Sequence, residues 1–209
     1  MIRSRMTLAA RRHIARTCPI FAALIRRVGP CRMERDRQTP YEALVRAIAH
    51  QQLHGKAART ITARFVALGD SAFPTPAEVL SFDDAAMRGC GFSASKIAAI
   101  RDIAIHAERG VVPSRRQAVR MSDARLIERL TEIRGVGRWT VEMLLMFTLG
   151  REDVLPVDDF GVREGYRILY DLPEQPKPRE LAAIGEAWSP HRSTAAWYLW
   201  RAVDEARAA

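Results

Sequence analysis

The chain has 209 residues, of which 48% are apolar, and it carries a formal net charge of +9. This length allows one domain or two small ones, with a core large enough to be stable without disulfides or metal ions. The charge favours a polyanionic partner such as nucleic acid. The three cysteines lack C-x-x-C spacing, which excludes a four-cysteine iron–sulfur cluster and disfavours a disulfide framework.

Apolar residues recur with a helical period along almost the whole chain, and no alternating pattern typical of a strand is found. The sequence therefore predicts an all-α protein. Thr39-Pro40 and Ser122-Asp123 supply capping chemistry just before two of the predicted helices, and segment 174–178 is the best candidate for a linker. The predicted helices cover about 6–16, 19–28, 41–50, 55–68, 94–109, 123–132, 138–149, 160–170, 178–187 and 193–207.

The segment Gln51-Gln52-Leu53-His54 interrupts a helical run. Two amides and an apolar side chain in such a break can enter a minor groove, where Leu53 would act as a wedge between base steps. The alternative is a buried leucine flanked by exposed amides. His50 and His54 lie four residues apart, but the glutamate of a helical zinc motif is missing, so we expect no zinc site. Further along the chain, we interpret Lys96 as a solvated charge.

The stretch Ile133-Arg134-Gly135-Val136-Gly137-Arg138-Trp139-Thr140 is the most informative part of the chain. Two glycines separated by one apolar residue make a tight turn, and this turn opens directly into a predicted helix. Unpaired backbone N–H groups there carry partial positive charge and can bind a phosphate, which the hydroxyl of Thr140 can also reach. The pattern favours a helix–hairpin–helix that binds the DNA backbone over an ordinary corner between two helices.

Two features beside the hairpin carry possible chemistry. Trp139, at the second position of the predicted helix, is either a core aromatic or a pocket wall for a flipped base, because an indole face attracts a cationic ring. Asp158 and Asp159 stand where the next helix begins, and the simplest interpretation is that one of them caps it. A helix N-terminus also suits an ionised carboxylate, which stabilisation of an oxocarbenium ion requires. Local chemistry does not decide which of the two acts.

Together these residues resemble the helix–hairpin–helix DNA glycosylase superfamily, in particular its 3-methyladenine DNA glycosylase II branch of alkylation repair. The resemblance runs from about Pro40 to Arg201, and the hairpin plus an aspartate at this spacing is its most specific part. It implies a single compact unit over 1–209. The N-terminal β-domain of some relatives is expected to be absent, because the helical pattern begins almost at once. Lobe one would cover about 41–150 and lobe two 1–40 plus 151–209, with the active cleft between them. The segments that carry the resemblance are LVRAIAHQQLHGKAA, GFSASKIAAIRDIA, IRGVGRWTVEMLLMF, LPVDDFGV and EAWSPHRSTAAWYLW.

The resemblance also implies roles for individual residues. Asp159 falls at the catalytic aspartate, Trp139 at an aromatic wall of the base pocket, and Leu53 at the intercalating residue. His191 stands where relatives can place an aromatic, so it would form the second wall. The backbone carbonyls of Thr131, Ile133 and Val136 fall where the family often holds a monovalent cation, Na⁺ or K⁺, that bridges to a phosphate. The DNA-binding set is Gln52, Leu53, His54, Arg134, Gly135, Val136, Gly137, Arg138 and Thr140.

The implied activity is that of a monofunctional DNA glycosylase in base excision repair, which flips alkylated purines such as 3-methyladenine and 7-methylguanine and hydrolyses the N-glycosidic bond. Bifunctional members carry a nucleophilic lysine where this chain has Trp139, and tryptophan cannot form a Schiff base. We expect a monomer, cytoplasmic and nucleoid-associated, that binds lesion-containing double-stranded DNA without a nucleotide cofactor or a membrane partner. The alternative is a non-catalytic helix–hairpin–helix protein that binds damaged or distorted DNA and needs neither Asp159 nor Trp139.

Overall fold

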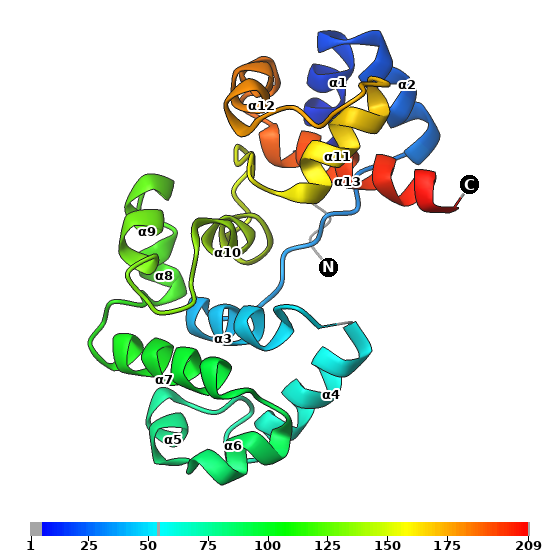
Figure 1. Ribbon diagram of the computed structural model, residues 1–209. Coiled ribbons are helices and arrows are strands. Elements are labelled where there is room, and N and C mark those ends of the chain that lie inside the picture. The colour runs from blue at the N-terminus through cyan, green and yellow to red at the C-terminus, as the bar shows by residue number, and fades with distance from the viewer. Residues whose placement is uncertain (1–5, 54, 209) are drawn as a thin grey trace. The chain divides into compact units, whose positions relative to one another are not determined.

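The computed structural model describes residues 6–53 and 55–208, and these residues form helices and loops without a strand (Figure 1). The prediction of an all-α protein is therefore confirmed. Each of the ten predicted helices is found within a few residues of its expected start. Among the described residues, no helix combines the length and the hydropathy that crossing a bilayer requires.

The chain divides into two compact units. Unit 1 joins Met1–Arg35 to Gly150–Ala209, and unit 2 is the continuous stretch Asp36–Leu149. The helices of unit 1 are α1 (Met6–Thr17), α2 (Pro19–Val28), α11 (Phe160–Leu169), α12 (Pro178–Gly185), the 3-10 helix η2 (Glu186–Trp188) and α13 (Arg192–Ala208). The helices of unit 2 are α3 (Pro40–His50), α4 (Gly55–Val66), α5 (Pro76–Ser81), α6 (Asp84–Cys90), α7 (Ala94–Glu108), α8 (Arg115–Ala118), α9 (Asp123–Leu130), α10 (Arg138–Met143) and the π-helix η1 (Leu144–Leu149).

The predicted linker at 174–178 is wrong, because this segment lies within unit 1 and is held there by side chains of α11. The amide of Gln175 donates to Glu164 over 2.8 Å, and the guanidinium of Arg163 donates to the carbonyl of Pro176 over 2.9 Å. Proline and glutamate composition suggested a solvated connection. Long-range hydrogen bonds from a neighbouring helix instead fix the segment to the fold.

Helix α7 is the central element of unit 2, where it packs along α3 and α5 (Figure 1). Its buried face consists of Ile97, Ala99, Ile100, Ile103 and Ala104. A cluster of aromatic rings fills the space beside it, with Phe65 making edge-on contacts to three other phenylalanines. The buried face of α7 thus belongs to the core of unit 2.

In unit 1, α11 and α13 pack unusually closely. Gly165 of α11 lies directly against the backbone carbonyl of Leu199 on α13, and a side chain at position 165 would overlap that carbonyl. Gly161, one turn earlier, faces the next residue of α13, Trp200. Because side chains normally keep helix axes 8–10 Å apart, two glycines four residues apart permit a closer crossing.

Three short helices, α5, α6 and α8, were not predicted because they are too short to show a helical period. Two of them nevertheless begin with a capping box, Thr75 with Glu78 and Ser114 with Gln117. Hydrogen bonds from the backbone and hydroxyl of Thr75 hold the pKa of Glu78 down at about 2. The predicted helix 138–149 also changes character, since its second half, η1, is a π-helix.

Candidate active site and nucleic-acid interface

The predicted hairpin forms between α9 and α10, and its glycine turn is closely packed. Gly135 has a φ of +79°, and a Cβ there would lie 3.1 Å from the Cβ of Ala99 and 3.4 Å from a methyl of Ile48. Only glycine combines this backbone angle with so little space. The apolar residues on either side, Ile133 and Val136, are 2% and 4% exposed, so they anchor the turn in unit 2.

Two of the hairpin amides already have acceptors, which shortens the predicted row of free N–H groups. The N–H of Val136 donates to the carbonyl of Ile133 over 3.0 Å, and the N–H of Arg134 donates to the carboxylate of Asp102 over 2.7 Å. Gly137 is the N-cap of α10 and supplies no capping side chain. Thr140 is only 4% exposed, so the structure does not support the predicted contact of its hydroxyl with a phosphate.

The hairpin also exposes two arginines and an indole. Arg134 and Arg138 are exposed, and Arg138 donates to the buried carboxylate of Glu142 over 2.9 Å while its side chain remains 60% exposed. Trp139 is 44% exposed. The core interpretation of Trp139 is therefore not supported, since nearly half of this residue is accessible.

The segment between α3 and α4 carries the predicted wedge. Leu53 is 39% exposed, which excludes the alternative of a buried leucine. Gln52 adopts a φ of +57°, a left-handed conformation that is uncommon for a residue with a side chain. The amide of Gln51 donates to the carbonyl of Gly135 over 3.2 Å, so this segment is tied to the hairpin. His54, the last residue of the predicted motif, lies outside the described residues.

Lys96 is not the solvated charge that we predicted. Its ammonium donates to the carbonyls of Ala49 and Gln51 over 2.9 and 2.7 Å, and burial lowers the pKa of the amine. The carbonyl of Ala49 lies in the last turn of α3 and that of Gln51 at its C-cap, where unsatisfied acceptors carry partial negative charge. A lysine at the start of another helix, far away in the sequence, supplies the missing donor.

Asp159 is the N-cap of α11, and one of its oxygens accepts two hydrogen bonds. Oδ1 accepts from the N–H of Val162 over 2.7 Å and from the indole N–H of Trp200 over 2.8 Å. Gly161 makes room for the indole, since a Cβ there would lie 2.8 Å from Cδ1 of Trp200. Asp158 is exposed, whereas Asp159 is half-buried and fixed. The geometry therefore distinguishes the two acids, which the local sequence did not.

Phe160, the residue after Asp159, exposes 65% of its surface. Sequence analysis passed over it because a single aromatic at the start of a predicted helix gives no periodic signal. Trp200 has no predicted role, because it stands among other aromatic residues of the last helix. The signal that could have revealed its role is the pair Gly161 and Gly165, four residues apart, which indicates a close helix crossing.

His191 precedes α13 and lies in unit 1 with Asp159. Its ring packs edge-on against His13 of α1, with ring centroids 5.5 Å apart, and its Nδ1 lies 3.6 Å from a carboxylate oxygen of Glu152. The next residue, Arg192, forms a two-pronged pair with Asp153, with N–O distances of 2.8 and 2.9 Å. This pair, which sequence analysis did not predict, fixes the segment that carries His191.

Burial alone would raise the pKa of Asp153, but hydrogen bonds from Arg192 and Ser189 outweigh it and lower the pKa. The same pair raises the pKa of Arg192. Both groups are about one-third exposed or less, so the charge-assisted bonds are only partly screened. The pair is thus a stable clamp at the start of α13.

The proposed cation ligands, the carbonyls of Thr131, Ile133 and Val136, lie within one turn of the hairpin. The carbonyl of Ile133 already accepts from Val136, but each carbonyl oxygen has a second lone pair. Uncharged oxygen donors of this kind suit a hard monovalent cation. The chemistry of the residues present therefore fits such an ion.

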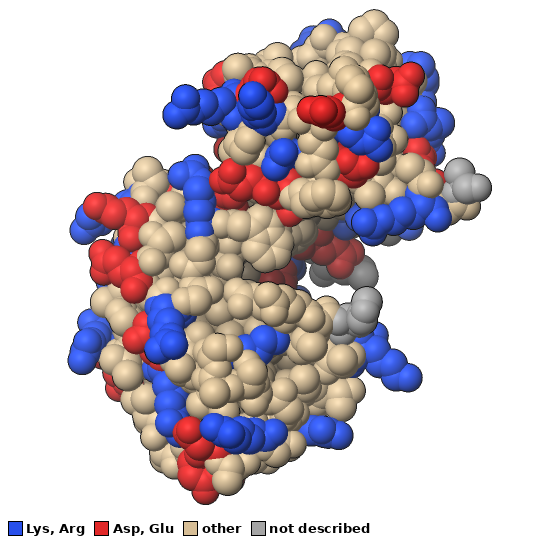
Figure 2. All heavy atoms as spheres, viewed as in Figure 1, with Lys and Arg blue, Asp and Glu red and all other residues tan. Residues whose placement is uncertain are grey.

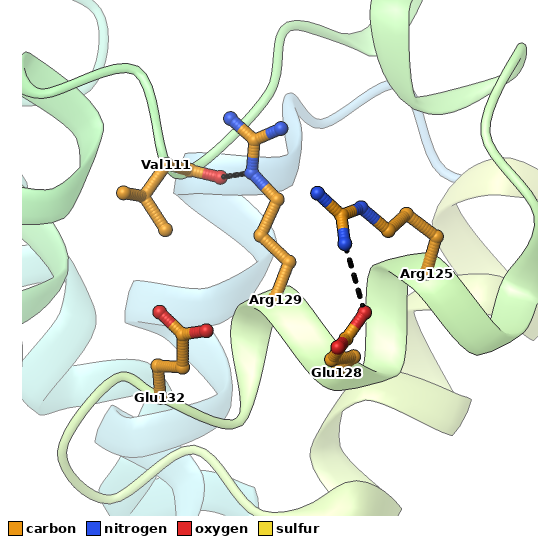
Figure 3. A pocket seen from close by; sticks show the side chains of 5 residues that line it. All are labelled: Val111, Arg125, Glu128, Arg129 and Glu132. Carbon is orange, nitrogen blue, oxygen red and sulfur yellow. Dashed lines mark hydrogen bonds and ion pairs between the residues drawn. The ribbon is translucent and has the colours of Figure 1, made fainter.

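Two cavities in the described structure are not lined by any predicted site residue. One, of about 210 Å³ in unit 2, is lined by Val111, two arginines and two glutamates, with Arg125 paired to Glu128 and Arg129 bound to the carbonyl of Val111 (Figure 3). The other, of about 450 Å³ in unit 1, is mostly apolar and lies among α2, α11 and α13. The face in Figure 2 shows basic side chains interspersed with acidic ones.

Comparison with known proteins defines the class. Residues 45–191 match the model of the HhH-GPD superfamily of base excision DNA repair proteins. The chain is 48% identical over 181 residues to DNA-3-methyladenine glycosylase 1 of Schizosaccharomyces pombe, a match that covers 85% of this chain and 79% of the relative. The chain belongs to the HhH-GPD superfamily.

Solved structures agree with this assignment. A 3-methyladenine DNA glycosylase of S. pombe in complex with abasic DNA has a TM-score of 0.84 at 44% identity, covering 92% of this chain and 95% of that one. A DNA-3-methyladenine glycosidase from Bacillus halodurans has a TM-score of 0.85 at 34% identity, covering 95% and 91%. The predicted family and fold are confirmed. The roles assigned to individual residues stay predictions, with Trp139 and the hairpin in unit 2 and Asp159 and His191 in unit 1.

Proposed function

We propose that the protein is a monofunctional DNA glycosylase that excises alkylated purines from duplex DNA and leaves an abasic site for base excision repair. The observation that carries this proposal is the fixed carboxylate of Asp159, in a chain 48% identical to a 3-methyladenine glycosylase. A protein that only bound DNA would not need an acid held by two donors on one oxygen. The exposed indole of Trp139 supports the same proposal.

In this function the groups of unit 2 bind and distort the DNA. The hairpin and the exposed Arg134 and Arg138 contact the phosphate backbone, which supplies affinity without sequence information. A monovalent cation at the hairpin carbonyls would add positive charge at the same phosphate. Leu53 fills the space left by the extruded nucleotide, and the base stacks on Trp139.

Asp159 then acts on the sugar. A purine methylated at N3 or N7 carries a formal positive charge, so the electron pair of the C1′–N bond leaves with the base and neutralises it. The sugar is left as an oxocarbenium ion, which the carboxylate stabilises while water adds to C1′ and loses a proton. Because the base departs without being protonated first, one carboxylate suffices and no general acid is required.

The absence of a lyase step follows from the lysines. The chain has lysine at positions 56, 96 and 177 and tryptophan at 139. Lys96 is held by two backbone carbonyls, and tryptophan has no amine for a Schiff base. The product is therefore an intact strand with an abasic site.

The test is a panel of duplexes that each carry one lesion: 3-methyladenine, 7-methylguanine, ethenoadenine or hypoxanthine. We expect strands that break only after treatment with hot alkali, and only when an alkylated purine is present. Undamaged duplex serves as the control. Tight binding to the lesion duplexes without alkali-sensitive sites would show a binding protein instead of a glycosylase. Breakage before alkali would show lyase activity.

A further inference from the structure

One side of α7 contacts both loops that are predicted to bind DNA. Lys96, Ala99 and Asp102 follow each other at three-residue spacing, which places them on one face of the helix. Lys96 binds the wedge segment through two carbonyls, Ala99 touches Gly135 of the hairpin, and Asp102 accepts from the backbone of Arg134. The two loops are therefore mounted side by side on one rigid helix.

The wedge segment depends on this mounting for its shape. Gln52 adopts a left-handed conformation, which persists only where the surroundings fix it. The carbonyl of the preceding residue, Gln51, is held by the ammonium of Lys96 at 2.7 Å, and the N–H of Leu53 donates to His50 over 3.2 Å. These bonds keep the chain bent so that Leu53 remains exposed.

Gln51 completes a bracket between the two loops. Its backbone carbonyl accepts from Lys96, and its side-chain amide donates to the carbonyl of Gly135 over 3.2 Å. Movement of the hairpin is thus transmitted through Gln51 to the residue beside the wedge. Lys96 anchors the bracket to α7.

We propose that Lys96 and Gln51 are positioning residues for base extrusion, which hold the wedge Leu53 in register with the phosphate-binding hairpin. The proposal rests on the proposed glycosylase function. Neither residue needs to touch DNA for this role. Loss of the bracket leaves backbone binding in place but lets the wedge move independently, so that binding no longer drives the nucleotide out of the stack.

The decisive variant is Lys96→Met, which keeps the length of the side chain and removes the ammonium. The readouts are the fluorescence of 2-aminopurine placed beside the lesion, the affinity for undamaged duplex, and the single-turnover rate of base release. We expect extrusion and release to fall at least about tenfold, because two charge-assisted bonds are lost, while affinity for undamaged duplex stays within about twofold. Lys96→Arg should retain most of the extrusion.

The matched control is Arg101→Met. Arg101 lies on the same helix, donates to the backbone carbonyl of Phe82 and pairs with the carboxylate of Asp84 over 2.7 Å, and neither partner belongs to a loop that is predicted to bind DNA. A purely structural role of cations on α7 would make the two variants alike in melting temperature and in every readout. Equal loss of extrusion in Arg101→Met and Lys96→Met would overturn the proposal.

A double variant tests whether Lys96 acts through Leu53. In a Leu53→Ala background, Lys96→Met should cause little further loss of extrusion, since no wedge remains to be positioned. Additive losses would contradict the proposal. If Lys96→Met does not fold, Gln51→Leu gives the same test, because it removes the bond to Gly135 and leaves the ammonium in place. Wild-type protein that extrudes the base but does not release it would refute the glycosylase function and not the bracket.

Discussion

The DNA-binding loops of unit 2 and the acid of unit 1 are held in opposite ways. In unit 2 the proposed functional groups are backbone atoms and exposed side chains of two loops. Lys96 and Asp102 of α7 hold the backbone of these loops through hydrogen bonds. In unit 1 the proposed functional group is one carboxylate, held by a backbone N–H and by an indole N–H from another helix. DNA binding therefore needs a loop of fixed shape, whereas base release needs one atom at a fixed position.

The largest effect is expected at the acid itself. Asp159→Asn keeps an oxygen that can accept from Val162 and Trp200, so the fold of α11 should survive. The negative charge opposite the sugar cation is lost, and base release should fall at least about 100-fold. Single-turnover excision and fluorescence anisotropy on the same lesion duplex measure both properties. Equal losses of DNA binding and base release would contradict the proposal that unit 2 binds DNA and Asp159 of unit 1 acts on the sugar.

The next effect concerns the indole that positions the acid. Trp200→Phe removes the N–H donor but keeps much of the ring, and we expect release to slow by about tenfold with little change in KM. Gly161→Ala displaces the same ring by bulk and should reproduce the loss. The control is Trp197→Phe. Trp197 lies one turn earlier on α13, and its described contacts are with Tyr198 and Arg201 and not with Asp159. A change in KM alone would assign Trp200 to binding.

A smaller effect is expected on the stability of unit 1. Asp153→Asn removes the charged pair with Arg192 and should cost about 1–2 kcal/mol of unfolding free energy near neutral pH. Because the folded-state pKa of Asp153 is lowered, its contribution is present above the unfolded pKa near 4 and is lost as the pH falls through the folded value. Urea unfolding at pH 7 and pH 3 should show the difference between variant and wild type narrowing in acid. A constant difference would mean that packing, and not charge, is lost.

The smallest effect sharpens the role of the hairpin. Arg134→Ala should weaken binding equally for damaged and undamaged duplex and reduce the slope of log K against log salt by about one. Filter binding between low and moderate salt measures the slope. The control is Arg120→Ala, at a position outside the predicted interface. An unchanged slope in Arg134→Ala would show that Arg134 does not contact phosphate.

Much of the architecture could be predicted from the sequence, because long helices carry a strong period and the hairpin carries its own glycines. Leu53 and Trp139 were also predicted to be more than core residues, and both are exposed. Features that depend on long-range contacts could not be predicted. The bond between Asp159 and Trp200 joins residues 41 positions apart, and the bond between Lys96 and Gln51 spans 45.

The errors have physical causes of the same kind. Thr140 was expected at the surface from its place in the first helical turn, but the rotation of α10 puts it into the core. Lys96 was predicted to be solvated because its partners, two carbonyls at the end of a helix, have no signature in side-chain composition. The three missed short helices had capping residues that local chemistry would have revealed, had periodicity not been the main criterion.

The glycine at position 165 has a consequence for how this protein can change. The indole of Trp200, which holds the carboxylate of Asp159, is carried on a separate helix. The distance between α13 and α11 therefore affects the position of the carboxylate. Any larger residue at 165 would lift Leu199 and carry Trp200 away with it. Selection on the rate of base release can therefore act on the buried contact between Gly165 and Leu199, although neither residue needs to touch DNA.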